Sequence, residues 1–283
     1  MLTFNQLKRS SKKVCSSLKE IKTSILTEDA NQFIIQSLKG YGVENNYNIT
    51  INDCGYNEIS LQVFEPKSQL NSFKSDYILI IPSSQKLLKS FYNTVNPNKT
   101  AFAEETISNY ELIIAKLQEN SNAKIILANY IEINDSTFGN FASKTELSFL
   151  FQLRKINFEL MKLSQKFDNL FINDILSLQN QFGLPFIIDD KFYINSDISF
   201  SLDFLPYFAK NTLDIIKSNE GVINKCLILD LDNTLWGGII GDDGIENIHI
   251  GDLGIGKAFS ELQLWIKQLK ERGIILAVSS KNS

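Results

Sequence analysis

The sequence predicts an α/β protein built on parallel β-sheet. Short apolar runs of strand length alternate with amphipathic, helix-like segments along all 283 residues. Most of these runs are continuously apolar, as expected for strands that are buried on both faces. A polar, turn-rich stretch at 215–225 interrupts the pattern and marks a boundary. We therefore expect two domains, at residues 1–220 and 221–283, each with helices packed on a sheet.

The expected elements follow one another in a regular order. Helices are expected where apolar residues recur at intervals of three or four. We expect Asp29 to cap the first of these helices, and Gly273 to end the last. Strands are expected at 23–26, 47–53, 75–83, 123–130, 169–176, 226–232 and 273–280. Helices are expected at 31–39, 103–120, 144–167, 204–217 and 257–272.

Composition excludes several classes of function. The formal net charge is −4, whereas a general nucleic-acid binder has a basic excess. The longest apolar runs have strand length and the N-terminus lacks an apolar signal-peptide core, so we expect a cytoplasmic protein without a membrane span. Cys15, Cys54 and Cys226 have no metal-ligand spacing and fit buried thiols in a reducing compartment. The single histidine, His249, excludes a multi-histidine zinc site.

A basic cluster lies near the start of the chain, at Lys8, Arg9, Lys12 and Lys13. One interpretation is a solvated helix face, and the other is a landing patch for an acidic partner. The sequence alone leaves both interpretations open.

The residues that best indicate chemistry come late, in the stretch CLILDLDNTLWGG at 226–238. The apolar strand ends in Asp230 and Asp232, and open parallel sheets bind ligands at the carboxyl ends of their strands. Alternation points the two carboxylates the same way, and two close negative charges call for a cation, Mg²⁺ by preference. Thr234 and the backbone amides of the turn, that of Leu231 among them, can hold a phosphate.

The last apolar strand ends in two hydroxyl groups, at Ser279 and Ser280. A right-handed crossover through the helix at 257–272 makes it a parallel neighbour of the strand with the aspartates. One carboxylate can then act as nucleophile and the other as proton donor, while a hydroxyl orients a phosphoryl oxygen. An Asp-x-Asp after an apolar strand is by itself often a simple strand end, so this second strand matters to the prediction.

The stretch LILDLDNTL resembles the first motif of the haloacid dehalogenase (HAD) superfamily, and ILAVSS resembles the second. The longer CLILDLDNTLWGGIIGDDGIENIHIG and the closing SSKN resemble the FkbH-like branch, which includes HAD phosphatases of subclass IIIC. The resemblance implies the first part of a Rossmann-like HAD domain with Mg²⁺ as cofactor. Asp230 would be the nucleophile that forms an aspartyl-phosphate, Asp232 the general acid and base, and Ser280 a ligand of the phosphoryl group. Residues 237–251 would form a flap-like hairpin that carries His249.

The first domain resembles the N-terminal domain of FkbH-like proteins in ILTEDANQFIIQSLKGYG, LQVFEPKSQLNSFKSDYILIIPSS and RKINFELMKLSQKFDNLFINDILSLQNQFG. That domain has a flavodoxin-like three-layer form similar to SGNH hydrolases, which need a serine after the first strand and a late Asp-x-x-His pair. Here the turn at 27–30 reads TEDA and the region has no histidine. We therefore expect a non-catalytic docking or substrate-orienting domain. Ser83 and Ser84 can line a vestigial cleft or cap the next helix.

The family also implies a substrate and a partner. FkbH-like proteins are associated with a phosphoglyceryl unit, which they dephosphorylate and load as glyceryl onto an acyl carrier protein. Such carriers are acidic, which gives the basic cluster a candidate partner. Members of the branch often carry an acyl-accepting cysteine where this chain has Ser279, so the chain departs from the pattern there.

The family pattern continues after its second motif with a lysine and an acidic pair, whereas the chain stops at Ser283. We therefore expect the front part of a longer, truncated HAD phosphatase that is inactive by itself. The alternative is a non-catalytic module that docks a carrier or partner protein through its first domain.

Overall fold

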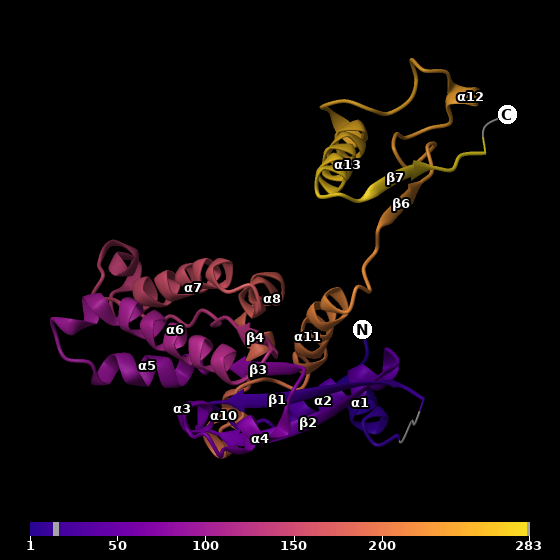
Figure 1. Cartoon of the computed structure of the whole chain (residues 1–283). Helices are drawn as coiled ribbons and strands as arrows, with labels where there is room; N and C mark the ends of the chain where they lie inside the picture. The colour runs from indigo at the N-terminus through magenta and orange to yellow at the C-terminus, as the bar shows by residue number, and fades with distance from the viewer. Residues whose placement is uncertain (14–16, 282–283) are drawn as a thin grey trace. The chain divides into compact units, whose positions relative to one another are not determined.

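The computed structural model describes residues 1–13 and 17–281, and the chain divides into two units, Met1–Ile216 and Lys217–Ser283 (Figure 1). Both units are built on parallel strands, so the predicted α/β class is confirmed. Within the described residues, no helix combines the length and the apolar character that crossing a membrane requires. Cys15, the asparagine of SSKN (Asn282) and Ser283 lie outside the described residues.

The first unit contains a five-stranded parallel sheet in the order β2-β1-β3-β4-β5. This is the flavodoxin-like order of doubly wound folds, as the family resemblance implied. The winding reverses between β1 and β3, and such a switch point is where sheets of this kind bind ligands. The strands are β1 (Lys19–Thr27), β2 (Tyr47–Tyr56), β3 (Tyr77–Ile81), β4 (Lys124–Ala128) and β5 (Leu170–Asn173).

Helices cover both faces of this sheet, because alternate strand residues are apolar and buried on opposite sides. Ile78 and Ile80 of β3 belong to one core, whereas Tyr77, Leu79 and Ile81 belong to the other. The first core is completed by α3 (Ile59–Phe64), α4 (Gln69–Phe73), α5 (Ser84–Asn93), α6 (Phe102–Asn120) and α7 (Phe149–Lys166). The second is completed by α1 (Phe4–Ser10), α2 (Gln32–Glu44), α8 (Ile175–Phe182), α9 (Leu184–Ile187) and α11 (Leu205–Asn219). The remaining elements of this unit are α10 (Asp190–Ser196) and the 3₁₀ helices η1 (Asn98–Ala101) and η2 (Gly139–Lys144).

Two details of the first unit differ from the sequence prediction. Asp29 does not cap α2, whose N-cap is Asn31, because the Asp29 carboxylate instead accepts a hydrogen bond from Ser199. The helix predicted from residue 144 begins at Phe149, because the hydroxyl of Ser148 accepts the amide that opens the first turn.

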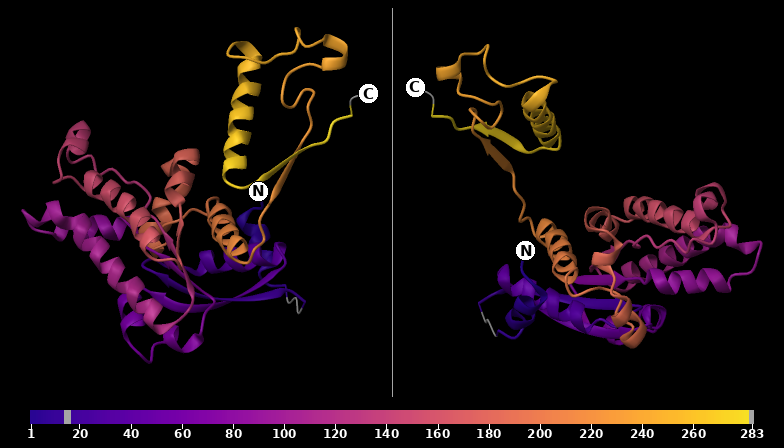
Figure 2. Two further views of the ribbon diagram at one scale, coloured as in Figure 1. Left: turned by 45° about the horizontal axis from the view of Figure 1, so that its top comes forward. Right: turned by 180° about the vertical axis from the view of Figure 1, so that it is seen from behind.

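The second unit pairs β6 (Cys226–Leu229) with β7 (Ile275–Val278) in parallel. Between them the chain forms α12 (Ile240–Asp243) and the long α13 (Gly254–Glu271), and Figure 2 shows α13 beside the two strands. Gly273, at φ 100°, ends α13 as predicted. Cys226 is exposed and Cys54 is buried, so the prediction of a core thiol was wrong for Cys226. The reason is that a two-stranded sheet leaves apolar surface open: Ile228 is 68% exposed.

Candidate active site

The two sequence motifs of the second unit meet at one edge of its sheet. Leu229 of β6 lies opposite Val278 of β7, and the Ser279 amide donates to the Leu229 carbonyl at 2.8 Å. Asp230 and Ser280 therefore both follow the carboxyl ends of neighbouring parallel strands. Both side chains are exposed at this edge, where an open sheet binds its ligands.

The carboxylate of Asp230 turns back onto its own loop. Its Oδ1 accepts a hydrogen bond from the backbone amide of Leu231 at 2.8 Å. This amide is one of the groups that the sequence assigns to phosphate binding. A phosphate that uses the Leu231 amide must therefore displace the Asp230 carboxylate from it.

The carboxylate of Asp232 has different partners. Its Oδ1 accepts one hydrogen bond from the indole Nε1 of Trp236 at 3.0 Å and another from the amide of Ile240 at 3.2 Å. The residue is half-buried, whereas Asp230 is exposed. The two aspartates are thus distinguished by their surroundings. Asp232 is fixed by two donors of the following loop, whereas Asp230 accepts from the amide of its chain neighbour.

A tight turn carries Thr234 past the two aspartates. The Thr234 amide donates to the Leu231 carbonyl at 3.2 Å, and Thr234 is half-buried. Asn233 adopts a left-handed conformation, φ 53°, and its Oδ1 accepts the Gly238 amide at 2.9 Å. Sequence reasoning did not single out Asn233, although asparagine is one of the few residues that tolerates this conformation.

The predicted flap at 237–251 is closed at its base by one residue pair. Gly237 and His249 exchange two backbone hydrogen bonds, of 3.0 and 2.7 Å. A β-carbon on Gly237 would lie 2.9 Å from Phe259 Cε2 and 3.0 Å from His249 Cβ, so a larger residue here forces a neighbouring side chain to shift. The segment includes the helical turn α12 rather than two continuous strands, and His249 is exposed on it.

The two aspartates fit a magnesium ion better than a metal that needs a full protein cage. Within residues 1–13 and 17–281, no group of three or more His, Cys, Asp or Glu side chains is arranged to hold a metal. Mg²⁺ is commonly bound through one or two carboxylates together with substrate phosphates and water. Asp230 and Asp232 supply hard oxygen ligands of this kind at one strand end.

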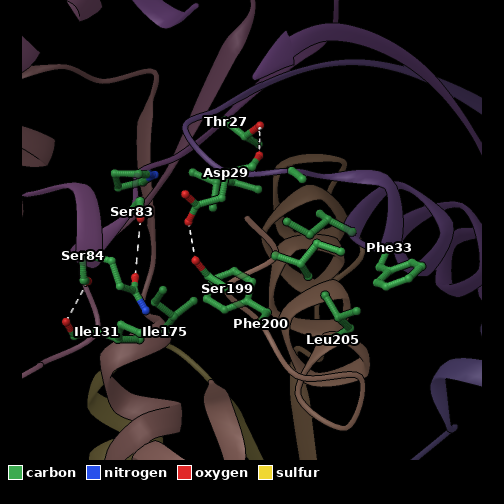
Figure 3. Close-up of a pocket in the computed structure, with 16 residues that line it drawn as sticks. Thr27, Asp29, Phe33, Ser83, Ser84, Ile131, Ile175, Ser199, Phe200 and Leu205 are labelled. Atoms are coloured by element: carbon green, nitrogen blue, oxygen red, sulfur yellow. Dashed lines mark hydrogen bonds between the residues drawn. The ribbon is translucent and has the colours of Figure 1, made fainter. Parts of the chain in front are cut away.

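A narrow pocket at the carboxyl edge of the first sheet contains the two serines noted in the sequence (Figure 3). Its volume of about 20 Å³ leaves room for little more than one water molecule. The Ser83 hydroxyl accepts the Lys86 amide as the cap of α5, and the Ser84 hydroxyl donates to the Ile131 carbonyl at 2.8 Å. Both serines therefore line a closed cleft, and one of them also caps a helix.

Comparison with known proteins agrees with this architecture. A family model described as the FkbH N-terminal domain matches residues 22–217. The chain is similar to the N-terminal part of the protein BF1531 from Bacteroides fragilis, a structure described as containing a phosphatase domain complexed with Mg. The identity is 41%, the match covers 100% of this chain and 74% of that chain, and the TM-score is 0.93.

The chain is more weakly similar to two hydrolases. A family 3 carbohydrate esterase from Clostridium thermocellum is 12% identical, with 71% of this chain and 99% of that chain covered and a TM-score of 0.48. The lipase Lip_vut3 from a goat rumen metagenome is 13% identical, with 69% and 96% covered and a TM-score of 0.48. No curated protein matches the chain. The family match over residues 22–217 and the 41% identity across the whole chain show that this protein belongs to the FkbH family.

Proposed function

We propose that this chain carries the nucleophile of a Mg²⁺-dependent HAD-type phosphatase, which acts through an aspartyl-phosphate. The observation that carries the proposal is the placement of Asp230 and Ser280 at one edge of the parallel β6–β7 pair, with Asp232 in the adjoining turn. The similar protein from Bacteroides fragilis, described with a phosphatase domain complexed with Mg, supports the same reaction class.

In the proposed reaction, a carboxylate oxygen of Asp230 attacks phosphorus while the bond from phosphorus to the leaving oxygen breaks. Asp232 gives its proton to that leaving oxygen, and later accepts one from the water that hydrolyses the aspartyl-phosphate. Because two donors hold Oδ1 of Asp232, we assign Oδ2 as the atom that carries the proton. Thr234 and Ser280 orient the phosphoryl oxygens. Bound Mg²⁺ would offset the negative charge shared by phosphate and carboxylates.

For the substrate we propose a phosphoglyceryl unit, and for the partner an acyl carrier protein. The structure supports the second proposal through the basic cluster, because Lys8 and Arg9 are exposed in the last turn of α1. Lys13 is less available, since its ammonium lies 3.0 Å from the carboxylate of Glu44. Exposed positive side chains on one short helix favour encounter with an acidic protein.

The test of the reaction is hydrolysis of p-nitrophenyl phosphate, with and without Mg²⁺, by this chain and by a form extended beyond Ser283. We expect turnover in the extended form, and a hydroxylamine-sensitive acyl-phosphate on the enzyme that Asp230→Asn abolishes together with turnover. Glu271→Gln is the control, because this exposed carboxylate lies at the far end of α13. Hydrolysis that survives Asp230→Asn contradicts the proposed nucleophile.

A separate titration tests the partner. Binding of a purified acyl carrier protein is measured by calorimetry for the parent chain and for the double variant Lys8→Glu, Arg9→Glu. We expect the charge reversal to weaken binding, and more strongly at low salt, because exposed charges are screened by ions. Equal affinity for both chains would show that α1 is not the docking surface, and would leave the phosphatase proposal intact.

A further inference from the structure

A second cavity opens at the carboxyl edge of the first sheet, on the side covered by α5 and α6. Its volume is about 220 Å³, somewhat below the roughly 300–1,000 Å³ of pockets for drug-sized ligands. An adjoining cavity of about 310 Å³ shares Glu28, Ile59 and Ser60 with it and adds Glu58. The polar lining of the first cavity comes from distant parts of the sequence and includes Glu28, Ser60, Lys86, Thr106, Tyr110 and Tyr130.

This cavity lies at the switch point of the sheet. Glu28 directly follows β1, and its amide donates to the carbonyl of Ile81, the last residue of β3, at 3.2 Å. The Glu28 side chain then crosses to the loop after β3, where Oε2 accepts the Ser83 amide at 2.6 Å. Sheets with this strand order bind ligands in the crevice between these two strands. The position therefore agrees with a ligand site on grounds of topology alone.

Around this cavity, the carboxylate side chains outnumber the ammonium side chains by one. The Lys86 ammonium donates to the Glu28 carbonyl and lies 3.4 Å from Asp29 Oδ1, at ion-pair distance. Asp29 points to the other side, into the pocket of Figure 3, where it also accepts from Ser199. The lysine charge is thus matched by Asp29, while Glu28 and, in the adjoining cavity, Glu58 add negative charge. A cationic ligand would restore the balance.

Two tyrosines form a neutral, hydrogen-bonded part of the cavity wall. Tyr110 and Tyr130 are buried, and their hydroxyls share a hydrogen bond of 2.8 Å. The backbone of Tyr130 is fixed by Asn157, whose amide group both donates to and accepts from it at 2.9 Å. Burial raises the pKa of both tyrosines, so the hydroxyls stay protonated at neutral pH. A preformed wall of this kind is typical of small-molecule sites.

Burial of the charged Glu28 side chain destabilises the folded state. Burial raises the pKa of Glu28, and the neighbouring Asp29 raises it further, against the lowering effects of the Ser83 amide and Lys86. Carboxyl groups whose pKa is perturbed by burial and by neighbouring charges inside a cleft are candidates for functional sites, and here the cavity and the switch-point position support the same assignment.

We propose that this cavity binds a small organic molecule with a primary ammonium group. Its N–H groups would donate to Oε1 of Glu28, the oxygen opposite the one that accepts the Ser83 amide. Its short apolar body would lie against Leu87 and Phe102, which also line the cavity. This binding activity goes beyond the proposed phosphatase chemistry, and neither depends on the other.

The test uses three four-carbon probes of similar size on the whole 283-residue chain: n-butylammonium, n-butanol and n-butyrate. Binding is followed through the backbone amide signal of Ser83 in two-dimensional NMR spectra. We expect n-butylammonium to shift this signal in a saturable manner, n-butanol to bind more weakly and n-butyrate not to bind. Tighter binding of n-butyrate than of n-butylammonium, or no binding of any probe, overturns the proposal.

Variants assign the binding to the cavity. We expect Glu28→Gln to weaken n-butylammonium binding at least about tenfold, or 1.4 kcal/mol, and Ser90→Phe to block the cavity sterically. Glu105→Gln is the matched control, because this exposed carboxylate lies on α6 and does not line the cavity. Unchanged affinity in Glu28→Gln, with the fold verified by circular dichroism, overturns the assignment. Asp230→Asn should bind the probe normally, which separates this test from that of the phosphatase.

Discussion

Replacing Gly40 by alanine is expected to displace α1 from α2. A β-carbon at Gly40 would lie 2.1 Å from the carbonyl oxygen of Leu7 and 2.8 Å from its Cα. These are backbone atoms of α1, so a change of side-chain rotamer cannot relieve the overlap. Alanine is otherwise favoured over glycine inside a helix by ~1 kcal/mol. Helix propensity therefore favours the substitution, whereas packing against α1 disfavours it. The distances indicate that the packing effect is the larger one.

The size of the effect follows from what α1 buries. Phe4 and Leu7 are 7% and 0% exposed. Burial of a side chain of this size contributes ~1.5–3 kcal/mol, so complete loss of both costs about 3–6 kcal/mol. The gain in helix propensity offsets ~1 kcal/mol of this cost. We expect a net loss of about 2–5 kcal/mol in the free energy of unfolding of the first unit.

Urea unfolding followed by far-ultraviolet circular dichroism measures this loss. Both tryptophans, Trp236 and Trp265, belong to the second unit, so their fluorescence is an internal control that should not change. Gly42→Ala is the comparison variant: its β-carbon would meet the Ile49 side chain at 2.7 Å but the nearest backbone atom, the Tyr47 carbonyl oxygen, only at 3.1 Å, so we expect a smaller loss than for Gly40→Ala. A Gly40→Ala chain that is as stable as the parent, or more stable, would refute the reasoning.

The remaining predictions concern the two sites. Because folding raises the pKa of Glu28, the folded chain binds its proton more readily, and stability falls as pH rises from ~4.3 through the raised pKa. Glu28→Gln should therefore be more stable than the parent at pH 7. The difference in their free energies of unfolding, measured by urea titration, should become smaller below about pH 4. A difference that does not depend on pH would contradict this. Gly237→Ala, but not Gly241→Ala, should speed proteolysis of the flap, because only the first β-carbon meets other atoms within 4 Å. Trp236→Phe should lower kcat of the extended form about tenfold or more at unchanged KM, since a hydrogen bond to a charged group contributes ~1.5–3 kcal/mol.

Strands and long helices were predictable because their signals are local. The run Tyr77–Ile81 is entirely buried, and its unbroken apolar residues alone predict a central parallel strand. The short helices α8, α9 and α10 were not predicted, and α1 was anticipated only as a helix face for the basic cluster. Helices of this length gain too little from their own hydrogen bonds, and contacts with the rest of the fold decide whether they form. Leu7 of α1 illustrates this, because it is buried in the fold and its backbone lies closely against Gly40 of α2.

The placement of the candidate site residues was predictable, but their hydrogen bonds were not. The apolar residues before Asp230 indicate a strand that ends there. Parallel pairing of β6 and β7 brings Ser280 to the same edge. The hydrogen bond from Trp236 to Asp232 depends on how the loop folds back onto the strand end. No local sequence pattern specifies that path. The Glu28 cavity was missed for the same reason. Its walls come from α3, α5, α6 and the end of β4, and only the folded topology joins them.

The contrast between the two aspartates gives the proposed phosphatase an order of events. Asp232 is already oriented by two donors, as a group that must transfer protons in both half-reactions requires. Asp230 instead occupies the Leu231 amide, which the proposal assigns to a phosphoryl oxygen. An arriving phosphate that takes this amide frees a carboxylate oxygen beside the phosphorus atom. Substrate binding would then release the nucleophile in the step that positions its target, so the carboxylate would be least constrained when it is needed.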